Sequence, residues 1–228
     1  MRVISRSTLV RFWDKHPAAR SALQTWCEDA NHAQWMTPKD IKRQYASASF
    51  VGANRVVFNI KGNDYRLVVA VAYRFSAVYI KFVGTHEQYD AIACCKSRKL
   101  TMKTVDLYPI HAIRTDDDYQ AALARVAPYF DNEPEPDSDA GAHFEALLTL
   151  IEAYEAKHFP MTPPDPIDAI LFRMEQRGLK PKDLEPMIGQ RNRVYEVLNR
   201  KRKLTMAMIW RLHTGLGIPA ESLIRQSA

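Results

Sequence analysis

The stretch 55-RVVFNIKGNDYRLVVAVAYRFSAVYIKFVGTHEQYDAI-92 decides the fold of the first part of the chain. Three of its segments, residues 55–60, 64–75 and 77–86, are rich in Val, Ile, Tyr and Phe, as strands are. The turn KGND joins the first two segments, and SA is the tightest point between the second and third. Links this short between consecutive strands predict an antiparallel meander.

Two helices are expected before this sheet. Ser5 or Ser7 can cap the first, in which apolar residues recur at helical spacing up to Trp13. Pro17 stands where the second helix would start, and a spacing of three and four continues to Ala30. Residues 31–54 mix Pro, Ser and Gly with few periodic apolar residues, which indicates mostly loop. Helices followed by a sheet predict a small α+β domain over residues 1–98.

The next segment, residues 99–165, is expected to be acidic and helical. Thr115 or Asp116 can cap a helix that runs to residue 130, and the acidic, Pro-rich stretch 131–142 is typical of a linker. A second helix over residues 143–160 carries an apolar stripe, and the prolines of MTPPDP end it. Residues 166–228 then predict several short helices joined by Gly, Pro and Thr.

Charge divides the chain into nearly the same three blocks. Residues 1–101 carry 16 Lys and Arg against 7 Asp and Glu, a net charge of +9. Residues 102–165 carry 4 against 13, a net −9, and residues 166–228 carry 12 against 6, a net +6. This alternation favours two polyanion-binding surfaces with an acidic segment between them.

Several classes of protein are disfavoured by composition. No apolar run reaches the ~20 residues of a membrane span, and the N-terminus lacks the apolar stretch of a signal peptide, so we expect a cytoplasmic protein that does not enter the membrane. Three cysteines, Cys27, Cys94 and Cys95, make a poor disulfide framework. The adjacent pair leaves a redox or metal role open, but incidental thiols are favoured because no further ligands stand at suitable spacing. We therefore predict neither a cofactor nor a metal.

The C-terminal block carries a candidate DNA-binding surface. Residues 184–188, a turn at Gly189 and residues 190–199 have the spacing of a helix-turn-helix, whose second helix reads bases from its N-terminal end. The candidate base-reading residues are Gln190, Arg191, Asn192 and Arg193, and Lys201, Arg202, Lys203 and Thr205 follow as candidate phosphate contacts. A solvated basic face on an ordinary bundle is the alternative.

From Pro166 to Arg225 the sequence, with IGQRNRVYEVLNRKRKLTMAMIWRLHTGLGIPAESLI at its centre, resembles the Xre/Cro-type helix-turn-helix of HigA-type antitoxins. The resemblance implies operator binding. Arg200 departs from it, because many relatives have Gly at this position of NGKRKL, and the departure puts the loop's positive-φ conformation in question.

The sheet segment carries a candidate catalytic site. Strand alternation places Arg55, Asn59 and Lys61 on one face of the first strand, and Arg66 and Arg74 on one face of the second. Tyr79 and Lys81 share a face of the third strand, which His86, Glu87 and Tyr89 follow. Cations and hydrogen-bonding groups near one face suit RNA cleavage by the 2′-hydroxyl, which needs a base, an acid and charge stabilisation. A surface histidine beside a solvated sheet face is the alternative.

The run from Phe58 to Ile92, especially GNDYRLVV and VGTHEQYDAI, resembles HigB-type toxins of the RelE-like ribonuclease superfamily, which cleave mRNA, usually on the ribosome. The resemblance extends weakly over residues 1–98. It implies a two-helix-plus-sheet fold and assigns roles by motif position. His86 is expected to transfer protons, Arg66 and Lys61 to stabilise phosphate charge, and Asn59 and Tyr89 to position the RNA.

Together the resemblances predict a type II toxin–antitoxin unit: an mRNA-cleaving domain, an acidic segment that covers it, and a helix-turn-helix that represses its own operon. The expected partners are mRNA, the ribosome, operator DNA and a second copy of the chain in a homodimer. The rival is a non-catalytic regulator whose α+β domain senses or binds a partner. The pentapeptide RKLTM occurs at 98–102 and at 202–206, but the flanking residues differ, so it is no structural repeat. Its first copy marks the expected seam between the two parts.

Overall fold

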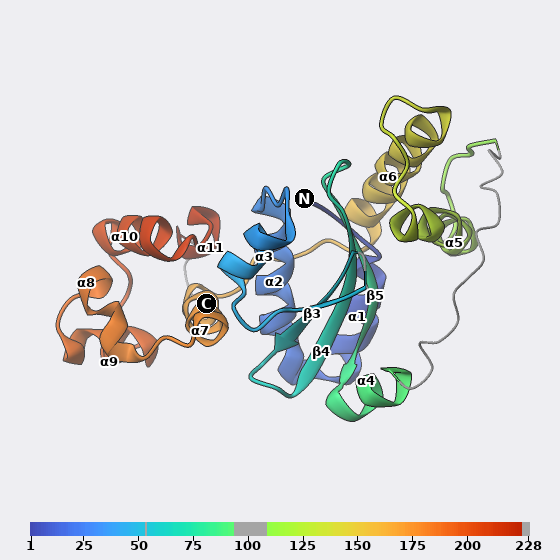
Figure 1. Cartoon of the computed structure of the whole chain (residues 1–228). Coiled ribbons are helices and arrows are strands. Elements are labelled where there is room, and N and C mark those ends of the chain that lie inside the picture. The colour runs from blue at the N-terminus through green and yellow to red at the C-terminus, as the bar shows by residue number, and fades with distance from the viewer. Residues whose placement is uncertain (53, 94–108, 225–228) are drawn as a thin grey trace.

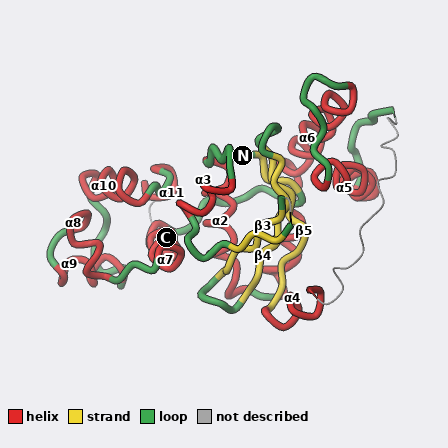
Figure 2. Tube along the Cα trace, in the orientation of Figure 1, coloured by secondary structure: helices red, strands yellow, loops and turns green. Residues whose placement is uncertain are grey.

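The computed structural model of the chain describes residues 1–52, 54–93 and 109–224 (Figures 1 and 2). Cys94, Cys95 and the first RKLTM copy, for which predictions were made above, lie outside the described residues. Within the described ranges, no helix combines the length and the apolar character needed to cross a membrane.

The predicted meander is confirmed. Strands β3 (Arg55–Ile60), β4 (Tyr65–Ala72) and β5 (Ala77–Thr85) pair antiparallel in sequence order. Val68 pairs with Phe82 but Val69 pairs with Ile80, so Lys81 is the extra residue of a bulge in β5. Two face assignments were wrong, because Lys61 and Arg74 lie beyond the ends of their strands, in the turns that follow them.

Two short edge strands were not predicted. β1 (Arg2–Ile4) pairs parallel with β5, and β2 (Ser49–Val51) pairs antiparallel with β3, giving the order β1-β5-β4-β3-β2. A segment of three residues is too short to show the alternation that predicts a strand. Each of these two strands forms because a longer neighbouring strand has a free edge with which it can pair.

Helices α1 (Arg6–Lys15) and α2 (Arg20–His32), as expected, cover one face of the sheet, with the one-turn 3₁₀ helix η1 (Pro17–Ala19) between them. Their apolar residues bury a core around Trp26 and Phe58. The expectation of loop over 31–54 was wrong in part, because α3 (Pro38–Gln44) forms there. Thr37 and Asp40 make a capping box around Pro38 at the first helical position, a start signal that outweighs weak periodicity.

The opposite face of the sheet is covered by α5 (Asp116–Asp131) and α6 (Asp139–His158) (Figure 1). Thr115 caps α5 as expected, and Ser138 caps α6, so that helix begins inside the stretch expected to be linker. Phe144 packs with Phe75 and Tyr129 in a second core that joins this acidic segment to the sheet. The short helix α4 (His86–Ala93) follows β5 at the far end of the sheet.

The last block is helical, as expected. α7 (Pro166–Arg177) begins at the Asp165 cap and ends at Gly178, whose φ is +66°. η2 (Pro181–Leu184), α8 (Glu185–Ile188), α9 (Arg191–Leu198), α10 (Met206–Leu216) and α11 (Ala220–Ile224) follow and enclose a third core. α8, α9 and α10 lie on the side of α7 away from the sheet (Figure 1).

Candidate functional site

The strand register brings three of the candidate catalytic residues to one end of the sheet. Arg66 pairs with Asn59 of β3 on one side and with Gly84 of β5 on the other. His86 stands two residues beyond Gly84, as the first residue of α4. Residues 27 positions apart in sequence therefore gather at the same sheet end.

Lys61 and Tyr89 lie at the same end but on different elements. Lys61 occupies the β3–β4 turn with a φ of +53°, and its Nζ lies 3.5 Å from Asp64 Oδ2. Tyr89 lies on α4, about one turn after His86, and is partly buried. The Nδ1 of His86 is 2.8 Å from Asp90 Oδ2, and both side chains are at least half exposed. The carboxylate orients the imidazole and leaves its other nitrogen available to a reacting group.

Arg66 is the buried cation of the group, with only 8% of its surface exposed. Its Nη1 donates to Asn63 O at 3.2 Å, which holds the guanidinium against the turn. No carboxylate of the described residues lies within ion-pair distance of it. A positioned cation with little compensating charge suits a phosphate that gains negative charge in a transition state.

Among the described residues, 1–52, 54–93 and 109–224, no three His, Cys, Asp or Glu side chains lie close enough together to hold a metal ion. The buried thiol of Cys27 has a pKa raised to about 12 by burial, so it is neither a nucleophile nor a ligand at neutral pH.

Helix α7 touches the back of this site, which no sequence pattern predicted. Gln176 Nε2 donates to Asn59 O at 2.9 Å and Gln176 Oε1 accepts from Ser47 Oγ at 3.3 Å. The neighbouring Glu175 is exposed, but partial desolvation raises the pKa of its carboxyl, a rise that the Gly62 backbone N–H opposes. The contact joins residues 117 positions apart, so only the tertiary structure reveals it.

Acidic side chains of α5, α6 and their link pair with cations of the first 98 residues. The described pairs are Arg2–Glu145 at 2.8 Å, Arg6–Glu155 at 3.7 Å, Arg11–Asp116 at 3.6 Å, Arg55–Asp131 at 3.3 Å, Arg74–Glu135 at 2.6 Å and Lys81–Asp131 at 3.0 Å. Most are partly exposed and individually weak, but together they spread the acidic block over the basic one.

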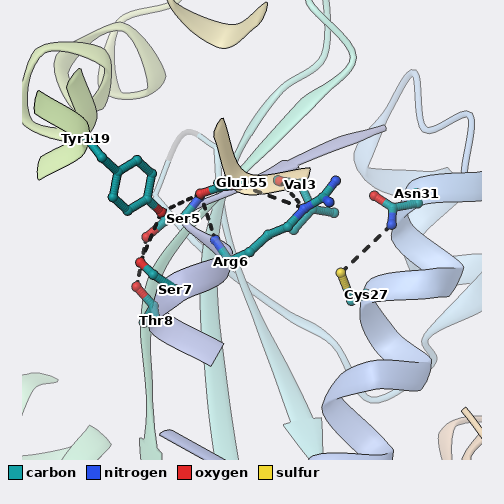
Figure 3. Close-up of polar contacts among 9 residues, drawn as sticks. All are labelled: Val3, Ser5, Arg6, Ser7, Thr8, Cys27, Asn31, Tyr119 and Glu155. Carbon is teal, nitrogen blue, oxygen red and sulfur yellow. Dashed lines mark hydrogen bonds and ion pairs between the residues drawn. The ribbon is translucent and has the colours of Figure 1, made fainter. Parts of the chain in front are cut away.

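Glu155 makes the deepest of these contacts (Figure 3). Its carboxylate is fully buried and accepts hydrogen bonds from the backbone N–H groups of Ser5 and Arg6, at 2.7 and 2.9 Å, and from the Tyr119 hydroxyl. Burial raises its pKa to about 7, against the opposing effects of these hydrogen bonds and of the Arg6 charge.

The candidate DNA-binding residues gather on a second, separate surface. Gln190 is the N-cap of α9, and Arg191, Asn192 and Arg193 form its exposed first turn, with Arg193 folded over Gly189. The exposed Lys201, Arg202 and Lys203 follow α9, and Arg202 pairs with Glu196 at 2.6 Å. The Thr205 hydroxyl accepts from Met208 N and so caps α10. All of these lie on α9 and the loop after it, away from the sheet (Figure 1).

Arg200 adopts the positive-φ conformation that glycine would favour, with φ +60°. Its guanidinium lies 2.5 Å from Asp168 and 3.1 Å from Asp165, at the start of α7. These ion pairs offset the cost of about 1 kcal/mol that a Cβ carries in this region. The turn therefore keeps its geometry without glycine.

Two comparisons bear on this arrangement. Residues 19–92 match the family model HigB_toxin, the RelE-like toxic component of a toxin–antitoxin system. A search of curated proteins found no match. The matched range runs from the start of α2 into α4 and includes Asn59, Arg66 and His86. The first part of the chain is therefore similar to the RelE-like toxins of toxin–antitoxin systems.

Proposed function

We propose that the chain is a toxin–antitoxin unit in which residues 1–98 cleave mRNA and the remainder restrains that activity and binds DNA. The observation that carries the first half is the sheet end where Asn59, Arg66 and His86 meet, inside the range that matches a toxin family. The observation that carries the restraint is the row of ion pairs and the shared core between the sheet and α5 and α6.

In this proposal the RNA 2′-hydroxyl loses its proton and attacks the adjacent phosphorus, which forms a 2′,3′-cyclic phosphate, and the 5′-oxygen takes up a proton and leaves as a hydroxyl. His86 transfers a proton, since its imidazole is exposed and oriented by Asp90. Arg66 and Lys61 stabilise the negative charge of the pentacoordinate phosphorus, and Asn59 and Tyr89 hold the nucleotide. The ribosome supplies mRNA in an extended form and is the expected site of action, in the cytoplasm.

The DNA-binding half of the proposal assigns α8, Gly189 and α9 as a helix-turn-helix. The Arg191–Arg193 turn of α9 reads base edges, while Lys201, Arg202 and Lys203 contact phosphates. Two copies of the chain would bind two half-sites, so the protein represses its own operon as a homodimer.

Cleavage of a reporter mRNA by the purified full chain, with and without translating ribosomes, tests the nuclease. The triple variant Asp116→Asn, Asp131→Asn, Glu135→Gln removes acidic partners of basic residues but keeps the buried contacts. We expect it to cleave several-fold faster than the unaltered chain, because exposed ion pairs hold the acidic segment over the basic surface.

Adding Arg66→Ala or His86→Ala to the triple variant should reduce cleavage by about 100-fold or more, the range for loss of a charge-stabilising or proton-transferring group. Lys39→Ala on exposed α3 serves as control and should change nothing. Cleavage that survives both site substitutions refutes these roles. No cleavage by any variant with translating ribosomes favours the non-catalytic regulator.

A further inference from the structure

A groove of about 550 Å³ lies between α1 on one side and the end of β5 with α4 on the other. This part of β5 continues past the residues that pair with β1. Helix α1 contributes one wall, and the end of β5 with the first turns of α4 contributes the other. The residues that line the groove include Arg11, Phe12 and Lys15 on α1 with its C-cap His16, Phe82 on β5 and Gln88 on α4.

The α1 wall is cationic at its rim. Arg11 and Lys15 are exposed and stand four residues apart, so both side chains project along the same face of the helix. Their Cβ atoms lie about 6 Å apart, so both cations can contact the same strand of a phosphate backbone. Two such cations beside one groove suit a polyanion backbone.

The inner wall is aromatic. His16 stacks on Phe12 with ring centroids 4.4 Å apart, and Tyr65 meets Phe12 edge-on at 5.4 Å. Phe82 lines the facing side and is only partly buried. Cations that follow a backbone together with aromatic rings for bases are the combination that binds single-stranded nucleic acid without sequence preference.

The groove reaches the candidate catalytic site. Gln88 lines the groove, and its Oε1 accepts from the Thr85 N–H at 2.9 Å, directly before His86. Gln88 Oε1 also lies close to Gly84, only 2.8 Å from where a Cβ at that position would stand. Gly84 is the residue of β5 that pairs with Arg66. Tyr65 pairs with Thr85 and precedes Arg66. A strand lying in the groove would therefore arrive at the end of β5, where the candidate residues gather.

An acidic side chain from α5 stands at this groove. Asp116, in the first turn of α5, lies 3.6 Å from Arg11, and both are more than half exposed. A pair this exposed is weak, so a phosphate can replace the carboxylate on Arg11.

We propose that the groove between α1 and α4 is the path by which single-stranded RNA reaches the sheet-end site, and that Asp116 competes with its phosphate for Arg11. The inference rests on the proposed nuclease function and extends it to a binding surface outside the sheet face. Arg11 and Lys15 hold successive phosphates, and the partly exposed His16, which stacks on the buried Phe12, receives a base.

The test is fluorescence anisotropy with the full chain and a labelled 2′-O-methyl RNA of about eight nucleotides, which binds but resists cleavage. Arg11→Ala/Lys15→Ala should weaken binding about tenfold or more and flatten the salt dependence by a slope of about 1.4, the loss of two phosphate contacts. Lys39→Ala/Arg43→Ala removes two exposed cations from α3 and should leave binding unchanged.

The competition between Asp116 and the RNA phosphate is tested by two substitutions that each remove one negative charge. Asp116→Asn should strengthen binding several-fold, whereas Asp117→Asn, its neighbour in the same helical turn, should not. Equal effects of the two overturn the specific role of Asp116.

RNA affinity that is unaffected by Arg11→Ala/Lys15→Ala overturns the groove as the path, even if Arg66 proves essential for cleavage. Absence of binding by both the unaltered chain and Asp116→Asn overturns it equally. Groove-dependent binding without any cleavage would instead support the path and refute the nuclease.

Discussion

Glu155 shows how one side chain can fasten two distant segments. Ser5 is the N-cap of α1 but lies at a φ of +71° and makes no side-chain cap, so the first N–H groups of that helix need another acceptor. Glu155, 150 residues further along the chain, supplies it (Figure 3). A negative group at a helix N-terminus is favourable, but the full burial of this carboxyl favours its neutral form.

The first prediction concerns pH. The pKa of Glu155 is about 7 in the folded chain and about 4.3 when unfolded, so the folded state binds its proton more tightly. The free energy of unfolding should therefore rise as pH falls from about 8 towards 5, by a few kcal/mol at most. Asp29, whose burial raises its pKa to about 6, contributes in the same direction.

Urea unfolding across this pH range checks the prediction. Glu155→Gln keeps an acceptor oxygen but cannot titrate, and should lose a large part of the pH dependence. Glu87→Gln, an exposed glutamate on α4, is the control and should keep all of it. An identical pH profile in Glu155→Gln would show that the group titrates normally.

Helix α7 connects the C-terminal helices to the sheet domain because its two faces belong to different cores. Ile170 and Met174 pack with α8 to α11, while Phe172 enters the core beneath α1 and α2. Arg173 follows Phe172 into the interior, where it is 1% exposed and lies 2.6 Å from Asp29 of α2. The Tyr45 hydroxyl completes the site by donating to Asp29.

The second prediction concerns this buried pair. Arg173→Met should lower the free energy of unfolding by about 3–5 kcal/mol, because Asp29 stays buried without its cation. Adding Asp29→Asn should recover much of that loss, since no unpaired charge remains. Denaturant unfolding of both variants measures the difference, and equal stability of the single and double variants would mean that the pair is not coupled.

Seen as a whole, the molecule keeps its two candidate nucleic-acid surfaces apart. The sheet end with Arg66 lies near α4, while the basic residues around α9 lie beyond α7 on the other side (Figure 1). Arg191, Arg193 and Lys203 are exposed although α7 is docked, so the proposed binding of DNA would require no release of the sheet domain. The acidic side chains of α5 and α6 pair with cations of the first basic block, whereas Arg200 and Arg202 after α9 pair with Asp165, Asp168 and Glu196.

The third prediction follows from this separation. Arg193→Ala should relax base preference at one position by about 1–3 kcal/mol, and Lys203→Ala should weaken binding to all sequences while reducing the salt slope by about 0.9. Arg66→Ala should leave DNA binding unchanged. Selection from a random duplex pool, followed by titration at several salt concentrations, measures these effects. A base preference that persists in Arg193→Ala means that α9 is not the reader.

Much of the fold could be predicted from residue patterns. The three long strands, α1, α2, α5 and the Gly178 stop of α7 were all expected, because alternation, caps and stop signals are local. β1, β2 and α3 were missed or taken for loop. For the candidate site, the residue types and their order were predictable, whereas the contacts of Gln176 and the orientation of His86 by Asp90 were not.

The sequence by itself determined the order of the longer elements, the three charge blocks and the residue types that could carry chemistry, since each depends on neighbours within a few positions. Only the tertiary structure decided which elements meet. In the folded chain the acidic helices pack on the sheet, Glu155 accepts hydrogen bonds at the start of α1, and Arg173 is buried beside Asp29. The contacts of Glu155 with the start of α1 and of Arg173 with Asp29 join residues more than 140 positions apart, and their energy depends on burial and geometry that no local pattern encodes.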